Sequence, residues 1–174
     1  MKRIARFEKV SIEQFYKDWV DTFGDTYSES HIKEIYEDIK LPQRATKGSA
    51  GNDFYLPIGI ELYPSETIKI PTGIRVHMED GWVLKCYTRS SLGFKYRLRL
   101  DNGTGIIDQD YYYSKNEGHI FAKITNETLR GSSLSSLTLK DGEAFMQGIF
   151  VEYGITYDDN VEDIRNGGFG STNK

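Results

Sequence analysis

The chain has 174 residues and a mass of 20.0 kDa, a length that suits one domain with a core of its own. It contains 22 Lys and Arg residues and 26 Asp and Glu residues, and it has no basic block, which argues against a nucleic-acid partner. The single cysteine, Cys86, excludes a disulfide framework and a cysteine-rich zinc site. Because neither a run of about 20 apolar residues nor a signal-peptide pattern is present, we expect a cytoplasmic protein without a membrane partner.

The first forty residues are predicted to form a short strand and a helical hairpin. Residues 3–8 favour the strand, and Ser11 with Gln14 matches a capping box in which Gln14 reaches back to Ser11. Apolar residues at helical spacing then run to Gly24: Ile12, Phe15, Tyr16, Trp19, Val20 and Phe23. A second helix is expected from Ser28 or Ser30 until shortly before Pro42.

From residue 44 onward, short alternating runs of apolar and polar residues predict strands. These runs lie at 74–78, 82–87, 97–100, 120–124, 137–139 and 144–151. Gly, Asn and Asp interrupt them about every 8–12 residues, which is typical of a β-sandwich or β-barrel. No segment of this part shows a helical period. The three histidines have no metal-ligand spacing and are expected to be packed or solvated, and residues 165–174 are expected to form a mobile tail.

Five segments in this β-rich part contain residue types suited to chemistry. They are the glycine-rich 45–53, TRSSLG at 88–93, the Asp-rich 101–111, Gln147 in an apolar strand, and GGFGST at 167–172. The guanidinium of Arg89 and the hydroxyls of Ser90 and Ser91 suit an oxyanion. Taken singly, each segment is also compatible with an ordinary turn, hairpin or tail.

In this order, the five segments resemble the five motifs of the trimeric dUTPases, over residues 42–172. The resemblance implies a mainly β fold, a jelly-roll-like barrel or sandwich, with 11–40 as a helical insertion in a single domain over 1–174. It also implies a homotrimer with shared active sites that hydrolyses dUTP to dUMP and pyrophosphate with Mg²⁺. The insertion is expected to be an outer packing layer, with a partner-binding arm as the alternative.

The resemblance also assigns roles to individual residues. Asp108 matches the catalytic carboxylate that activates water, Tyr111 the platform under the deoxyribose, and Asp53 a carboxylate that contacts the metal through water. Phe169 would stack on the uracil. The implied substrate-binding residues are Arg89, Ser90, Ser91, Asn102, Gly105, Ile107, Tyr111, Gln147, Arg165, Phe169, Gly170, Ser171 and Thr172.

The sequence departs from the family pattern at several places. Residues 112–117 lengthen the loop after Tyr111, and Arg165 stands two rather than three residues before the Gly pair, which leaves its reach to the phosphates open. Asn52 and Thr88 replace a common aromatic and a common proline. Two alternatives remain: a dCTP deaminase, alone or bifunctional with dUTPase activity, and a non-catalytic nucleotide sensor. Glu117 is the glutamate nearest the third motif that a deaminase would need.

Overall fold

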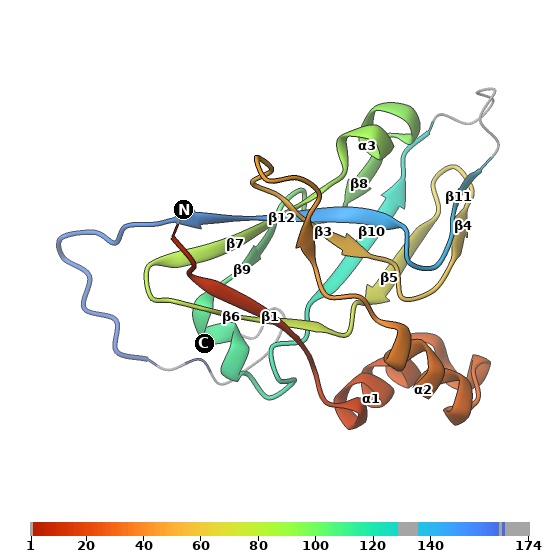
Figure 1. The fold of residues 1–174 in the computed structure, drawn as a ribbon, viewed down its shortest axis with the longest axis horizontal. Coiled ribbons are helices and arrows are strands. Elements are labelled where there is room, and N and C mark those ends of the chain that lie inside the picture. The colour runs from red at the N-terminus through yellow and green to blue at the C-terminus, as the bar shows by residue number, and fades with distance from the viewer. Residues whose placement is uncertain (1, 129–135, 164, 166–174) are drawn as a thin grey trace.

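The computed structural model describes residues 2–128, 136–163 and 165, and Figure 1 shows a mainly β fold with two helices packed at one side. Within these residues, twelve strands form four antiparallel sheets. The largest sheet has five strands in the order β2 (Gln43–Arg44), β3 (Asn52–Tyr55), β12 (Ala144–Glu152), β7 (Trp82–Thr88) and β9 (Gly105–Ile107).

The other sheets are smaller. Their members are β5 (Thr67–Pro71), β10 (Phe121–Asn126) and β8 (Leu98–Leu100) in one sheet, β1 (Ala5–Lys9) with β6 (Ile74–Met78), and β4 (Ile60–Leu62) with β11 (Leu137–Leu139). Short antiparallel strands that bury alternate side chains are what the sequence pattern indicates. The predicted mainly β fold is therefore confirmed.

A β-bulge in β12 shapes the centre of the large sheet. Ala144 pairs with Tyr55 and Met146 pairs with Phe54, so Phe145 is the extra residue between two paired positions. Phe145 and Met146 are consequently both buried, with 0% and 1% of their surface exposed. After the bulge, alternation resumes and places Gln147 on the face opposite to Met146.

The N-terminal hairpin consists of α1 (Ile12–Phe23), the 3₁₀ turn η1 (Gly24–Thr26) and α2 (Glu29–Asp38). It packs against the β body, with Phe15 and Trp19 fully buried in the same core as the strands. Ser11 and Ser28 cap the two helices by accepting hydrogen bonds from Gln14 N–H and His31 N–H. This hairpin is therefore a packing layer over the core, as expected.

The predicted capping box at α1 is correct in only one of its two bonds. Ser11 Oγ accepts from the backbone N–H of Gln14 at 3.1 Å, but the Gln14 side chain donates instead to Asp18 Oδ2 at 2.8 Å. The Ser11 N–H donates to Glu117 Oε2 at 2.7 Å. The distant carboxylate replaces the local amide because an ionised acceptor makes the stronger hydrogen bond.

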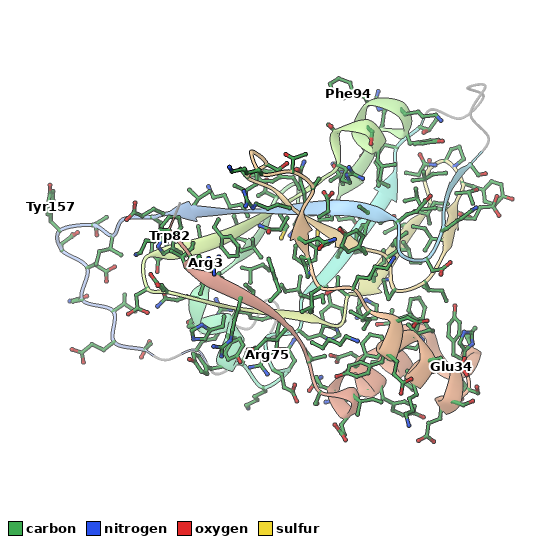
Figure 2. All side chains as sticks on the ribbon, in the orientation of Figure 1. Arg3, Glu34, Arg75, Trp82, Phe94 and Tyr157 are labelled. Atoms are coloured by element: carbon green, nitrogen blue, oxygen red, sulfur yellow. The ribbon has the colours of Figure 1, made fainter. Side chains whose placement is uncertain are left out.

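A second difference is α3 (Ser90–Tyr96), in a region expected to contain no helix. It is only seven residues long, too short to show a helical period, and ends at Arg97, which adopts a left-handed conformation with φ of 52°. Leu92 is its one buried residue, whereas Phe94 is 92% exposed at the outer end of the fold (Figure 2).

After β12, residues 153–163 run away from the body of the fold and turn back (Figure 1), and Tyr157 points outward in Figure 2. All of these residues are exposed. No helix of the described residues has the length and apolar character needed to cross a membrane.

Candidate active site

A tight turn joins β8 to β9, which belong to different sheets and do not pair with each other. Gly103 has a φ of +69°, a conformation that favours glycine, and its N–H donates to Leu100 O at 2.8 Å. A Cβ at Gly105 would lie 3.1 Å from Cys86 Cβ, so this glycine lets β9 approach β7 closely. The backbone of residues 102–105 therefore forms a turn with a defined conformation.

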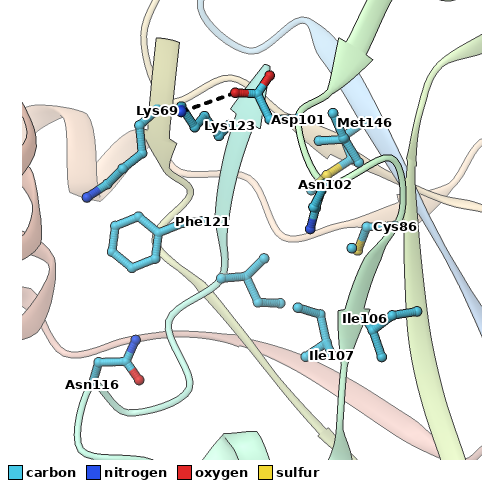
Figure 3. A pocket seen from close by; sticks show the side chains of 13 residues that line it. Lys69, Cys86, Asp101, Asn102, Ile106, Ile107, Asn116, Phe121, Lys123 and Met146 are labelled. Atoms are coloured by element: carbon cyan, nitrogen blue, oxygen red, sulfur yellow. Dashed lines mark ion pairs between the residues drawn. The ribbon is translucent and has the colours of Figure 1, made fainter. Parts of the chain in front are cut away.

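This turn borders a cavity of about 480 Å³ (Figure 3). Asn102, Gly105 and Ile107, all expected to bind substrate, line it together with Cys86. Cys86 is 2% exposed, and burial raises the pKa of its thiol to about 12, so it forms a neutral wall. An ion pair between Lys123 and Asp101, 3.2 Å apart, lies among the lining residues (Figure 3).

Tyr111 lies in η2 (Gln109–Tyr113), which directly follows β9. Its side chain is held at the hydroxyl: Tyr111 Oη donates to His119 O at 2.7 Å and accepts from Asn116 Nδ2 at 2.8 Å. Burial raises the pKa of Tyr111, which keeps the hydroxyl neutral. The ring is therefore fixed both by its backbone and at its far end.

Asp108 joins β9 to η2, and its side chain makes no capping hydrogen bond at the start of η2. Arg165 Nη2 lies 2.5 Å from Asp108 Oδ2, and Arg165 Nε donates to Asp110 Oδ1 at 2.9 Å. These three side chains line a second cavity of about 480 Å³, next to Lys85 and Ile106. Ile106 contributes to the lining of both cavities.

A separate group of expected site residues lies on the five-stranded sheet. Asp53, Gln147 and Tyr87 are direct neighbours across β3, β12 and β7, so their side chains share one face. Arg89 Nε lies 3.5 Å from Asp53 Oδ1. Gly51 makes room for Gln147, since a Cβ at Gly51 would lie 2.6 Å from Gln147 Oε1.

Comparison with known proteins decides the family. The dUTPase family model matches residues 37–173, most of the chain. The chain belongs to the dUTPase family. A relative in Lactococcus lactis, named deoxyuridine 5'-triphosphate nucleotidohydrolase, is 39% identical over 137 residues, which are 77% of this chain and 88% of the relative.

Solved structures agree with this membership. The dUTPase of Streptococcus mutans is 31% identical, with a TM-score of 0.60 over 86% of this chain and 97% of its own. A mutant dUTPase of the Staphylococcus aureus phage phi11, described with a structural Mg(II) ion, has a TM-score of 0.63 over 92% of this chain and 98% of its own. At 19% identity, the phage structure shows the shared fold alone.

In this dUTPase-family chain, the expected site residues fall into two groups. The first lies at the two cavities: Asn102, Gly105 and Ile107 line one, Asp108 and Arg165 line the other, and the Tyr111 ring lies beside Arg165. The second lies on or beside β3, β12, β7 and the start of α3: Asp53, Arg89, Ser90, Ser91 and Gln147.

Neither of these two cavities brings the two groups together in the part of the chain that the structure describes. The linings of both cavities, as far as the chain is described, include no member of the second group. Phe169, Gly170, Ser171 and Thr172, with the rest of the expected tail beyond Arg165, lie outside the described residues. Among the described residues, no cluster of three or more His, Cys, Asp or Glu side chains is arranged to hold a metal ion.

Sequence reasoning missed the residues that support Tyr111. His119 was expected to be merely packed or solvated, yet its carbonyl accepts from Tyr111 and its ring contacts Asp18 of α1. Asn116, in the lengthened loop, was noted only as part of a departure from the family pattern. The spacing of Asp18, four residues after Gln14 and three after Phe15, places it at the edge of the buried helical face.

Proposed function

We propose that this protein is a dUTP diphosphatase that hydrolyses dUTP to dUMP and pyrophosphate. The observation that supports this most strongly is the position of Asp108. Asp108 directly follows β9, which borders the first cavity, and Tyr111 lies three residues further on. The first cavity is large enough for a nucleobase, and the Asp108 carboxylate and the Tyr111 ring follow β9 along the chain. This order fits a nucleotide with its phosphate chain beside Asp108.

The uracil occupies the first cavity, which Asn102, Gly105 and Ile107 line. Backbone groups of 102–106 read its polar edge, and Gly105 permits the close approach because it has no side chain. Tyr111 lies under the deoxyribose, where its ring leaves no room for a 2′-hydroxyl. UTP is therefore rejected by crowding and by the cost of burying that hydroxyl without a partner.

Asp108 acts as the general base. It takes a proton from the attacking water while the bond linking the α- and β-phosphates breaks, which leaves dUMP and pyrophosphate. Arg165, paired with Asp108 in this structure, moves to the substrate phosphates when these enter. Its charge then stabilises the phosphate oxygens instead of holding the base.

The second group of residues handles the phosphates. Arg89, Ser90, Ser91 and Gln147 supply donors, and Phe169 to Thr172 close over the bound nucleotide. Asp53 offers a hard carboxylate oxygen, which suits Mg²⁺ and its retained waters. When bound, Mg²⁺ neutralises charge on the phosphates, and most of its ligands are phosphate and water oxygens.

We propose a homotrimer in which each active site combines residues of different subunits, each subunit being one domain over 1–174. The support is the separation of the two residue groups within a single chain: one borders the cavities and the other lies elsewhere on the five-stranded sheet. A neighbouring copy can bring the second group to the first. A cytoplasmic location remains a prediction.

The deaminase alternative is not favoured. Glu117, the glutamate nearest the third motif, uses both carboxylate oxygens on Ser11, at 2.7 Å from its N and 2.6 Å from its Oγ. It therefore caps α1 and is not available as a proton carrier. Asp108, a half-exposed carboxylate that lines a cavity, likewise argues against a sensor without activity.

The test is pyrophosphate release from dUTP, dCTP, dTTP and UTP measured in parallel with Mg²⁺, together with an ammonia assay on dCTP. We expect rapid release from dUTP, far slower release from the others and no ammonia. Absence of release from dUTP at micromolar enzyme would refute the proposed activity, and ammonia from dCTP would favour the deaminase.

A further inference from the structure

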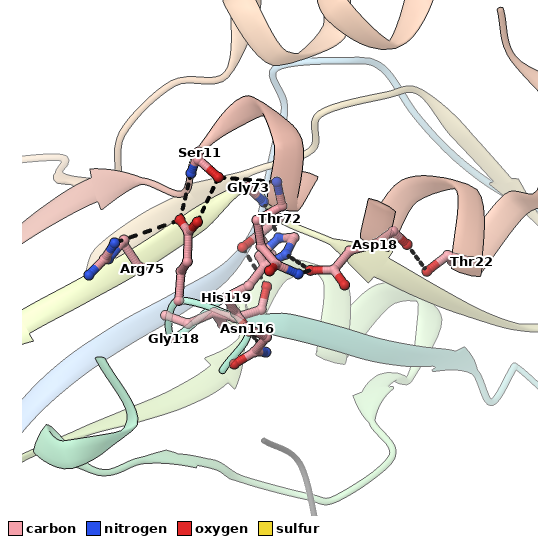
Figure 4. A network of polar contacts seen from close by, with 12 residues as sticks. Ser11, Asp18, Thr22, Thr72, Gly73, Arg75, Asn116, Gly118 and His119 are labelled. Atoms are coloured by element: carbon pink, nitrogen blue, oxygen red, sulfur yellow. Dashed lines mark hydrogen bonds and ion pairs between the residues drawn. The ribbon is translucent and has the colours of Figure 1, made fainter. Parts of the chain in front are cut away.

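A buried hydrogen bond links α1 to the loop that follows Tyr111 (Figure 4). His119 Nδ1 lies 2.6 Å from Asp18 Oδ2, and the histidine side chain is fully buried. The same Asp18 oxygen accepts from Gln14 Nε2 at 2.8 Å. Residues 101 positions apart in the chain are thus joined inside the protein.

The other ring nitrogen of His119 determines the direction of this hydrogen bond. The Gly73 N–H donates to His119 Nε2 at 2.7 Å, so Nε2 is an acceptor and Nδ1 carries the proton that is donated to Asp18. Burial would raise the pKa of Asp18, but the hydrogen bonds from His119 and Gln14 outweigh it and leave the pKa lower than usual. Asp18 is therefore an ionised acceptor for a neutral imidazole.

The imidazole is hydrogen-bonded at both nitrogens and also packs against two tilted aromatic rings. The ring centroid of Phe121 lies 4.5 Å from that of His119, and the centroid of Phe15 lies at 6.2 Å. The peptide that carries the His119 carbonyl is held as well, because its N–H, that of Ile120, donates to Ile74 O at 2.9 Å. This carbonyl accepts the hydroxyl of Tyr111 at 2.7 Å.

The loop between Tyr111 and His119 is hydrogen-bonded to the start of the same helix, α1. Glu117 accepts two hydrogen bonds from Ser11 at the start of α1 (Figure 4). Asn116 donates to Tyr111 Oη at 2.8 Å, and Ser114 holds Asn116 by donating to its Oδ1 at 2.7 Å. His119 and Asn116, which hydrogen-bond to the Tyr111 hydroxyl, therefore lie in a segment that α1 anchors.

We infer that Asp18 is a positioning residue for sugar discrimination: through His119 it holds the Tyr111 ring in the place where a 2′-hydroxyl would have to fit. The inference rests on the proposed function. Rejection of an added hydroxyl by a close-fitting wall is worth only about 10² in specificity, so it depends on a wall that does not yield. The inserted helix supplies that rigidity from outside the substrate-binding residues.

The experiment compares kcat/KM for dUTP with kcat/KM for UTP in the wild type, Asp18→Ala and Asp18→Asn. The ratio of the two is independent of the fraction of folded enzyme. We expect Asp18→Ala to lower it about tenfold, and Asp18→Asn, whose amide oxygen still accepts from Nδ1, to retain most of it. Asp21→Ala removes an exposed carboxylate of the same helix and serves as the matched control, with an unchanged ratio.

A double-mutant cycle with Tyr111→Phe tests whether Asp18 acts through the Tyr111 hydroxyl. Because this variant lacks the hydroxyl that His119 and Asn116 hold, adding Asp18→Ala to it should lower the ratio no further. Asp18→Ser, too short to reach Nδ1, replaces Asp18→Ala if the alanine variant does not fold. An unchanged ratio in Asp18→Ala or Asp18→Ser, or full additivity in the cycle, overturns the inference. A wild type without dUTP hydrolysis would instead refute the proposed function.

Discussion

Arg165 and Asp108 form an ion pair in which Nη2 of the arginine lies 2.5 Å from Oδ2 of the aspartate. They are 57 positions apart in the sequence. The Arg165 side chain is only 19% exposed, against 50% for Asp108, and its guanidinium carbon lies 5.6 Å from the centre of the Tyr111 ring. The arginine thus contacts both the proposed base and the proposed sugar platform.

Asp108→Asn is expected to lower turnover of dUTP by at least about 10²-fold, since general-base catalysis contributes about 10²–10⁴. Binding of a non-hydrolysable dUTP analogue should change little, because the amide occupies the same space. Asp110→Asn is the matched control, as Asp110 pairs with the same arginine. Asp110→Asn should change turnover by at most about fivefold, because an exposed ion pair contributes at most about 1 kcal/mol. Near-normal turnover in Asp108→Asn would show that the base is another group.

Gly51→Ala is expected to reduce activity with little loss of stability. The new Cβ would lie 2.6 Å from Gln147 Oε1, at the flexible end of that side chain, so the amide moves and leaves the phosphate-binding face. Gly48→Ala is the control from the same loop, since a Cβ there meets no atom within 4 Å among the described residues. Steady-state kinetics and thermal unfolding of both variants provide the measurement. Equal activities of Gly51→Ala and Gly48→Ala would show that Gln147 does not contribute to the site.

Glu117→Gln is expected to flatten the acid dependence of stability. Burial tends to raise the pKa of Glu117, but the hydrogen bonds from Ser11 and the charge of Arg75 outweigh it, and the pKa lies below its ordinary 4.5. The unfolded chain therefore binds the proton more readily, so this stabilisation is complete above pH 4.5 and lost as the pH falls through the folded-state pKa.

Urea unfolding of the wild type and Glu117→Gln between pH 7 and pH 3 checks this. The free-energy difference between them should be largest near neutral pH and shrink on acidification. Glu34→Gln, an exposed carboxylate of α2, is the comparison and should show a smaller pH-dependent difference. A difference between wild type and Glu117→Gln that does not vary with pH would contradict the prediction.

Shared active sites predict complementation between inactive variants. Asp108→Asn and Gln147→Ala each disable every site of a homotrimer, but a mixed trimer contains sites in which both residues are native. Refolding the two variants together should therefore restore activity that neither has alone. Light scattering should give about 60 kDa, three times the 20.0 kDa chain. A stable monomer, or no recovery on mixing, would contradict sharing.

Local patterns predicted most of the fold. Alternation placed the strands at 74–78 and 137–139 at their observed bounds, because period-2 burial is visible in a few residues. Helical spacing likewise predicted α1 and α2. The helix α3 was missed because seven residues with a single buried side chain show no period. The Glu117 cap of α1 was missed because its partner lies 106 positions away.

For the site, the sequence by itself determined the family, the expected site residues and the type of chemistry, because each motif is a short run and the order of the motifs can be read along the chain. Only the tertiary structure decided that Arg165 pairs with Asp108, that the two groups lie apart in one chain, and that Asp18 and His119 support Tyr111. These relationships join residues remote in sequence, and such contacts depend on how the sheets and the inserted helix pack.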